Sequence, residues 1–223
     1  MLFFEFIGKE LELFYKILVF LIPAIPMTLK ITILSFCLAL VMGLLIGLAR
    51  VSRINILRIL AAAYVDIIRG VPLLVLIFFI YFGLGKVFNL PQFTAGIIAI
   101  SICYSAYVGE IVRAGIQAIS RGQYDAAQSL GMTNNQTMRH IILPQAFRIV
   151  LPPLVNDFVA CLKDSSLVSI IGLRELTRAG REFYSQYFVA FETWFIIGLI
   201  YLAMTFVLSK FSAMIERKYQ IRS

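Results

Sequence analysis

The sequence predicts an all-α integral membrane protein with five transmembrane helices, its amino terminus outside and a structured polar connection in the cytoplasm. Hydrophobic residues make up 61% of the 223 residues and charged residues only 14%, whereas soluble domains contain about 25% charged residues. The mean hydropathy is +0.90. Five segments contain the roughly 20 mostly apolar residues that a membrane-spanning helix needs, and one long polar passage separates two of them.

The basic residues predict the orientation in the membrane. Arg50, Arg53 and Arg58 crowd the first connection, and more Lys and Arg residues gather in the third connection and the tail, whereas the second connection has only Lys86. Because cytoplasmic loops carry an excess of Lys and Arg, the carboxyl terminus is expected in the cytoplasm. The fourth connection, with three arginines, has to lie outside against this rule. The same bias explains the net charge of +8, so we expect no nucleic-acid partner.

Two regions are expected along the chain. Residues 1–20 mix five charged residues with Phe and Leu, which is typical of an amphipathic helix at the membrane surface and unlike a cleavable secretion signal. Residues 21–223 form the transmembrane region, with its polar connection at about 120–145. The spans are expected at residues 22–49, 59–84, 92–114, 149–171 and 188–209.

The first span carries Gly43 and Gly47, one helical turn apart. This spacing lets a second helix approach closely, and that helix can belong to the same chain or to a second subunit. The fifth span is apolar apart from its outer end, where Trp194 suits an interfacial anchor. We expect the fifth span to be scaffold.

The second span contains Asp66 and Arg69, three residues apart and therefore on one helical face, followed by Gly70 and Pro72. The proline predicts a kink. Charges at membrane depth are costly and face protein or water. Asp66 and Arg69 are therefore either a structural ion pair or part of a gate.

The third span carries a stripe of small and polar residues at helical spacing, which includes Tyr107, Glu110 and Arg113. A carboxylate in a span has to be paired or hydrated. Glu110 therefore either pairs with Arg113, one turn further on, or lies on a path for a transported molecule.

The fourth span is expected to begin after Pro152 and Pro153. It continues with Asn156, Asp157, Lys163 and Asp164, and its two carboxylates lie seven residues apart, roughly 10 Å along one side of a helix. Lys163 and Asp164 can neutralise each other or belong to a gate. Asp157 has no basic residue within one turn, which makes it the better functional candidate.

The polar connection has the signals of two short helices. Ser120 and Gln123 have the spacing of a capping box, Gly131 suits the left-handed residue that ends a helix, and Thr133 with Gln136 repeats the cap. Pro144 is expected to stop the second helix. Such a pair also looks like a DNA-binding helix-turn-helix, but about forty residues between two spans leave little room for that domain.

A family resemblance starts in this connection. The run Asp125-Ala126-Ala127, three residues, Gly131, nine residues, Ile141, one residue and Leu143-Pro144 resembles the EAA loop of permease subunits in bacterial ATP-binding-cassette importers. Only Asp125 departs from the pattern, and it keeps a carboxylate. Polar amino acid permeases are similar in further motifs, namely Arg69-Gly70-Val71-Pro72-Leu73-Leu74, Tyr107 to Ile116, Gly122-Gln123, Leu143-Pro144-Gln145-Ala146 and Leu162-Lys163-Asp164-Ser165-Ser166-Leu167. Val71, Leu76 and Ser165 depart from the residues common in that family.

The resemblance implies a type I ABC importer permease fold in the bacterial cytoplasmic (inner) membrane. It also implies partners: a dimer of ATPase subunits, a second permease, either identical or related, and an external or periplasmic binding protein that delivers an amino acid. The coupling helix that contacts the ATPase would contain Asp125, Ala126, Ala127, Leu130 and Gly131. Movement of this loop would tilt the third and fourth spans between inward-open and outward-open states.

The chain itself is not expected to be an enzyme or to bind a cofactor or metal. It has no Gly-x4-Gly-Lys-Ser/Thr loop to cradle phosphates, so ATP and Mg²⁺ are expected on the partner ATPase. Two other function classes stay open: a secondary transporter or channel that needs no ATPase, and a membrane scaffold that transports nothing.

The polar stripes of the third and fourth spans predict the substrate. Glu110 and Asp157 would supply negative charge, with Tyr107 and Asn156 giving hydrogen bonds or packing. A zwitterionic amino acid balances its own two ends, so surplus carboxylates favour a basic side chain such as that of arginine, lysine or histidine. Glutamine or another neutral polar amino acid is the alternative, in which the acids only neutralise Arg69 and Arg113.

Overall fold

The computed structural model describes the backbone of residues 2–219 and the side chains of residues 8–210 and 214. The regular elements in this range are all helical, as the sequence predicts. The α-helices are α1 (Leu2–Leu21), α2 (Ile25–Arg50), α3 (Asn55–Gly70), α4 (Leu73–Phe78), α5 (Gly85–Phe88), α6 (Gln92–Gln117), α7 (Arg121–Ser129), α8 (Asn134–Thr137), α9 (Leu143–Asp164), α10 (Leu176–Tyr187) and α11 (Ala190–Tyr219). Between them lie the 3₁₀ segments η1 (Ile22–Ala24) and η4 (Ser165–Ile171) and the π-helical segments η2 (Phe79–Leu84) and η3 (Met138–Ile142).

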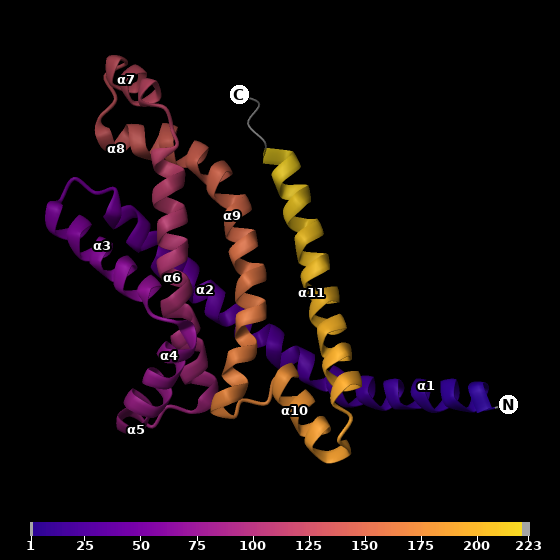
Figure 1. Ribbon diagram of the computed structural model, residues 1–223. Helices are drawn as coiled ribbons and strands as arrows, with labels where there is room; N and C mark the ends of the chain where they lie inside the picture. The colour runs from indigo at the N-terminus through magenta and orange to yellow at the C-terminus, as the bar shows by residue number, and fades with distance from the viewer. Residues whose placement is uncertain (1, 220–223) are drawn as a thin grey trace.

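Helix α6 lies at the centre of the fold, packed against α2, α3 and α9 (Figure 1). The contact with α2 is the tightest. A Cβ atom added to Gly43 would lie 2.5 Å from Val108 Cβ, and one added to Gly47 would lie 2.6 Å from Val112 Cβ. The close approach that the sequence predicts for these glycines is therefore made to a helix of the same chain.

The predicted second span is broken at its proline. α3 ends at Gly70, α4 begins at Leu73, and the chain bends by 100° between the two helical parts. Val71 has an extended backbone (φ −104°, ψ 129°) because the residue before a proline is forced out of the helical region. Pro72 then starts the next helix, where its missing N–H costs nothing. The kink predicted from Pro72 is confirmed in this sharper form.

The polar connection forms two short helices with a tight turn between them, as predicted. The N–H of Gly122 donates to Ser120 Oγ at the start of α7 (3.1 Å), a simple cap without the predicted partner Gln123. Gly131 has a φ of +77° just after α7. At α8, Thr133 and Gln136 form the full capping box.

Two predictions from proline are wrong. Pro144 does not stop the second helix, because α8 continues through η3 into α9 and Pro144 lies in the first turn of α9. Proline is tolerated in the first turn of a helix, because a backbone N–H at that position would make no hydrogen bond within the helix. The π-helical turn before Pro144 is a common irregularity inside α-helices. Pro152 and Pro153 lie inside α9 and do not mark the start of a helix, while the point where the chain enters the membrane stays a prediction.

The end of the molecule opposite α7 and α8 is held together by α1, α10 and α11 (Figure 1). Ile17 and Leu21 of α1 are fully buried against Leu176 and Phe183 of α10. Glu175 caps α10, accepting hydrogen bonds from the N–H groups of Thr177 and Arg178 and from the Tyr201 hydroxyl of α11. The amino-terminal helix thus packs onto this end, while its predicted position at the membrane surface stays a prediction.

In the described range, three helical stretches are long and apolar enough to cross a membrane: Gly8–Arg50, Gln92–Gln117 and Ala190–Lys210. The bent pair Asn55–Gly70 and Leu73–Phe88 makes a fourth if it counts as one span. α9, the predicted fourth span, is outside this group because its prolines and polar residues lower its hydropathy. It nevertheless packs between α6 and α11 (Figure 1). The count of five spans stays a prediction.

Candidate functional site

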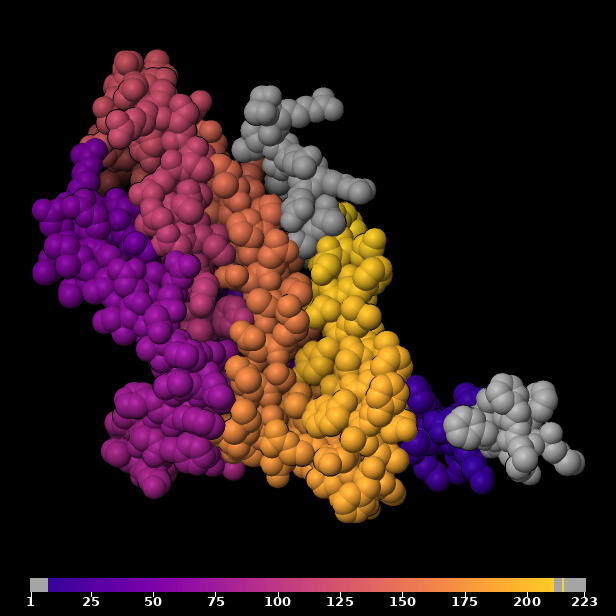
Figure 2. Space-filling view, in the orientation of Figure 1, coloured from indigo at the N-terminus to yellow at the C-terminus, as the bar shows by residue number. Residues whose placement is uncertain are grey.

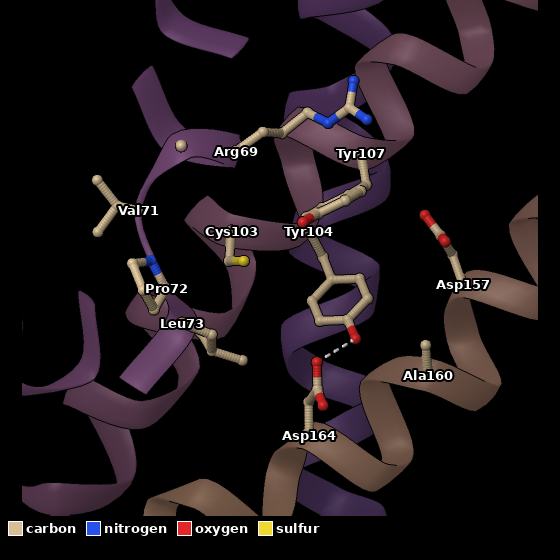
Figure 3. Close-up of a pocket in the computed structure, with 11 residues that line it drawn as sticks. Arg69, Val71, Pro72, Leu73, Cys103, Tyr104, Tyr107, Asp157, Ala160 and Asp164 are labelled. Carbon is tan, nitrogen blue, oxygen red and sulfur yellow. Dashed lines mark hydrogen bonds between the residues drawn. The ribbon is translucent and has the colours of Figure 1, made fainter. Parts of the chain in front are cut away.

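A central cavity of about 480 Å³ lies where the break between α3 and α4 faces α6 and α9 (Figure 3). Its volume is within the range of about 300–1,000 Å³ that is usual for small-molecule sites. Three elements line it, with Arg69, Gly70, Val71, Pro72 and Leu73 from the break, Cys103, Tyr104 and Tyr107 from α6, and Asp157, Ala160 and Asp164 from α9. Intervals of three and four residues place each helix's contributions on one face.

Arg69 and Tyr107 form one side of the central cavity. The guanidinium carbon of Arg69 lies 5.2 Å from the centre of the Tyr107 ring, within the range of a cation–π contact. From the sequence, Tyr107 was expected to contact the substrate, and Arg69 was expected to form either an ion pair with Asp66 or part of a gate. The structure instead brings Arg69 and Tyr107 together in the cavity.

Tyr104 and Asp164 form the opposite side. The Tyr104 hydroxyl donates a hydrogen bond to Asp164 Oδ2 at 2.8 Å (Figure 3). Sequence reasoning missed Tyr104, although it lies one helical turn before Tyr107 and so shares its face. One of the two alternatives for Asp164 was a pair with Lys163, but Lys163 has no carboxylate within 4 Å in the described part of the chain.

Asp157 contributes a carboxylate that the protein leaves incompletely bonded. Its Oδ2 atom is buried and has no hydrogen-bond partner among the described residues. In Figure 3 the carboxylate points into the same space as Arg69 and the two tyrosines. A buried, unpaired carboxylate oxygen is costly. Asp157 is therefore placed to bind a donor that enters the central cavity.

Glu110 lies outside the central cavity and is fully engaged. It forms ion pairs with Arg50 at the end of α2 and with Arg113 on α6. Arg113 Nε donates to both carboxylate oxygens at 3.1 Å, and Arg113 also donates to Gln117. The pairing with Arg113, one of the two alternatives from the sequence, is formed, and Arg50 adds a tie between α2 and α6.

The remaining candidates are not part of this cavity. Within the described residues Asp66 and Arg69 form no ion pair within 4 Å, so a gate role for Asp66 is still only a prediction. Asn156 is exposed and does not line the central cavity. No group of three or more His, Cys, Asp or Glu side chains that could hold a metal occurs in the described range.

The predicted coupling residues stand at one end of the molecule, where α7 and α8 project beyond the long helices (Figure 2). Asp125, Ala126 and Gly131 are exposed, and the Leu130 side chain is 83% exposed. Ala127 is buried, with 4% exposure, so its side chain packs α7 onto the fold. The contact of these residues with an ATPase stays a prediction.

Residues 39–221 match the protein family described as "Binding-protein-dependent transport system inner membrane component". The glutamine transport system permease protein GlnP of Escherichia coli strain K12 is 40% identical over 209 residues, which cover 89% of this chain and 95% of GlnP. The arginine transport system permease protein ArtQ of Bacillus subtilis strain 168 is 34% identical over 201 residues, covering 89% and 92%. The L-cystine permease TcyB of the same strain is 40% identical over 194 residues, covering 86% and 82%.

Solved structures are also similar. A chain from the crystal structure of an amino acid ABC transporter with histidines has a TM-score of 0.86 and 43% identity, covering 92% of this chain and 96% of that one. The inward-facing MetNI methionine ABC transporter gives a TM-score of 0.80 at 19% identity, covering 92% and 99%. At that identity, the second likeness supports the fold alone.

Proposed function

This chain belongs to the family of binding-protein-dependent transport system inner membrane components, as the permease of an amino acid ABC importer, and we propose that it carries a basic amino acid through the central cavity. The observation that carries the proposal is the buried Asp157 oxygen that faces this cavity without a partner. Transport would proceed by alternating access, with Asp157 meeting the substrate between the two open states.

The charges of the central cavity suit an amino acid. Arg69 supplies one positive charge, and Asp157 and Asp164 supply two negative charges, so the lining carries a formal charge of −1. A guanidinium binds a carboxylate well, so Arg69 would take the substrate carboxylate and Asp157 its α-ammonium group. Asp164 would then remain for a positive side chain, held in place by the Tyr104 hydroxyl.

A neutral polar amino acid such as glutamine is the second candidate. The Tyr104 hydrogen bond already satisfies one oxygen of Asp164, and Arg69 with Asp157 would balance a zwitterion without any help from Asp164. The 40% identity to a glutamine permease favours this reading, whereas the relation to an arginine permease favours the first. The two candidates differ in the task they give to Asp164.

The partners follow from the family and stay part of the proposal. ATP hydrolysis would be carried out by a separate ATPase pair that binds ATP and Mg²⁺ and receives the exposed tip around Leu130 and Gly131. An external binding protein would deliver the amino acid. A second permease, either another copy of this chain or a related chain, would complete the pathway.

The test is ATPase stimulation in the complete transporter, reconstituted with its ATPase and binding protein and supplied with single amino acids. We expect arginine, lysine or histidine to stimulate hydrolysis in the parent protein. Asp157→Asn should reduce the response by about tenfold or more, because it removes a charge-assisted hydrogen bond of about 1.5–3 kcal/mol. Glu192→Gln, which changes a carboxylate on α11 away from the cavity, should leave it unchanged.

Two results would count against this proposal. Stimulation by glutamine and not by arginine would replace the basic substrate with a neutral one. An undiminished response of Asp157→Asn to every active amino acid would remove Asp157 from the pathway.

A further inference from the structure

A second cavity, of about 790 Å³, lies at the end of the molecule that carries α7 and α8. It opens between these helices and the connection from α2 to α3. Four arginines line it: Arg50, Arg53, Arg58 and Arg121. The other lining groups are amides, hydroxyls and apolar side chains, with no carboxylate among them. We call it the arginine cavity.

Three of the four charges in the arginine cavity are not neutralised. Arg50 has Glu110 as its counter-ion. Arg53 donates to Asn134 Oδ1 at 2.7 Å and Arg58 to Asn55 Oδ1 at 2.9 Å, but both acceptors are neutral. In the described part of the chain, Arg53, Arg58 and Arg121 have no carboxylate within 4 Å. Like charges around one cavity repel each other unless an anion joins them.

The surroundings indicate where that anion comes from. Beside Arg58, the first turns of α3 expose Ile56 and Ile59, each 61% exposed, and Leu57, 43% exposed. Apolar side chains exposed in this way on a membrane protein suit acyl chains. A basic pocket next to such a surface at the cytoplasmic leaflet is the arrangement that binds anionic headgroups, and guanidinium groups bind phosphate in a bidentate manner.

We propose that the arginine cavity binds the phosphate of an anionic lipid from the cytoplasmic leaflet. Arg58 and Arg121, which no carboxylate of the described residues neutralises, would hold the phosphate, with Arg53 beside them. The exposed Leu130, where the proposed ATPase contact would be made, does not line the arginine cavity.

Because of where the arginine cavity lies, a bound lipid would affect how movements of α7 and α8 reach the transmembrane helices. Asn134 Oδ1 accepts hydrogen bonds from Arg53 of the α2–α3 connection and from Gln128 of α7 (3.1 Å). A headgroup bound among these residues would hold the connection between α2 and α3 against α7 and α8. The bound lipid would then stiffen the link through which α7 and α8 move the transmembrane helices.

The experiment measures retained lipid by native mass spectrometry on the complete transporter in phosphatidylcholine nanodiscs, with and without phosphatidylglycerol. The parent protein should retain phosphatidylglycerol in preference to phosphatidylcholine. Arg58→Gln/Arg121→Gln should weaken retention by about twenty-five-fold, since each basic residue near an anionic surface contributes roughly a factor of five. The matched control Arg139→Gln/Arg148→Gln removes two exposed arginines that do not line the arginine cavity and should retain the lipid as the parent does.

Additional arms separate the possible occupants. Inorganic phosphate at millimolar concentration should not displace the lipid, and displacement would make free phosphate the ligand. Retention only after removal of the ATPase would assign the cavity to an acidic surface of that partner and overturn the proposal. Equal loss of retained lipid in both double variants would also overturn the proposal. Size-exclusion profiles of both variants check that they assemble.

Discussion

Glu110 and Asp157 are both carboxylates on the helices of the central bundle, but their neighbours give them different tasks. Glu110 is held by Arg50 and Arg113, so its charge is already used to join α2 to α6. Asp157 has one buried oxygen without a partner, and this oxygen faces the central cavity. A carboxylate that two guanidinium groups already neutralise binds a further cation weakly, whereas Asp157 has an oxygen that is available to accept a hydrogen bond.

The change Glu110→Gln should therefore destabilise the protein without altering what it transports. It leaves Arg50 and Arg113 close together without a negative charge, at a cost of about 1–3 kcal/mol for a partly buried pair. We expect a lower melting temperature in detergent and an unchanged rank order of amino acids in the ATPase assay. Glu12→Gln is the control, because its ion pair with Lys16 is exposed and should not affect melting. A changed substrate order in Glu110→Gln would return Glu110 to the substrate path.

At the scale of single residues, the sequence predicted which side chains line the central cavity better than it predicted which side chains contact each other. Asp157 and Tyr107 were predicted from their helical spacing, and both line the central cavity. Tyr104 was missed and the contact of Arg69 with Tyr107 was not foreseen, because the contacts that decide their positions join α3, α6 and α9. Helical periodicity shows which residues share a face of one helix, but not which face of another helix they meet.

The turn between α7 and α8 depends on one glycine. Gly131 has a φ of +77°, where a β-branched residue is strained by about 1–3 kcal/mol. Gly131→Val should therefore distort the exposed tip while the rest of the fold, to which a Cβ at this position makes no contact within 4 Å, stays intact. We expect normal membrane insertion, measured by fractionation, and ATP hydrolysis that no longer drives uptake.

A conformational control separates turn geometry from side-chain size at this position. Gly131→Asn should retain much of the coupling, because asparagine tolerates the left-handed region. Full coupling in Gly131→Val would show that the tip does not transmit the movement.

The contact between α2 and α6 should be sensitive to added volume. A Cβ at Gly43 would lie 2.9 Å from the Ser105 carbonyl oxygen as well as 2.5 Å from Val108 Cβ, so Gly43→Leu must force the helices apart. Overpacking of this kind costs about 1–3 kcal/mol, and the melting temperature in detergent should fall. Gly198→Leu on α11 is the matched control, since nothing lies within 4 Å of its added Cβ. Equal melting of the two variants would contradict this packing.

The prolines show which element boundaries a sequence can predict. Pro72 breaks its helix because Val71 before it is forced into an extended backbone. Pro144 does not, because a π-helical segment precedes it and it falls in a first turn. The effect of a proline thus depends on the backbone of its neighbours, which is set by packing. The capping box at Thr133 and Gln136 is local, and it was predicted correctly.

At the scale of the whole chain, the proposed transport would use two parts of the structure. A cavity lined by charges lies among the long helices, and an exposed apolar tip lies at one end. The phosphate-binding loop of an ATPase is absent from the sequence. In the proposed importer, a separate ATPase would supply the energy through the tip.

Uptake should therefore require the assembled transporter. Vesicles that contain this chain alone should not accumulate labelled amino acid, because nothing biases the two open states. Addition of the ATPase, the binding protein and ATP should start accumulation. Flux through the chain alone would support the secondary transporter or channel class.

In the proposed pathway, the break between α3 and α4 would set the distance that a polar solute has to travel without bulk water. α3 has 16 residues and is about 24 Å long, shorter than the roughly 30 Å hydrocarbon layer. A span that enters this layer at the start of α3 would therefore reach the break inside the layer, and the central cavity at the break would divide the barrier into two thinner ones. Each open state would then hydrate only one of these portions, which is a smaller distortion than opening a channel through the full thickness of the membrane.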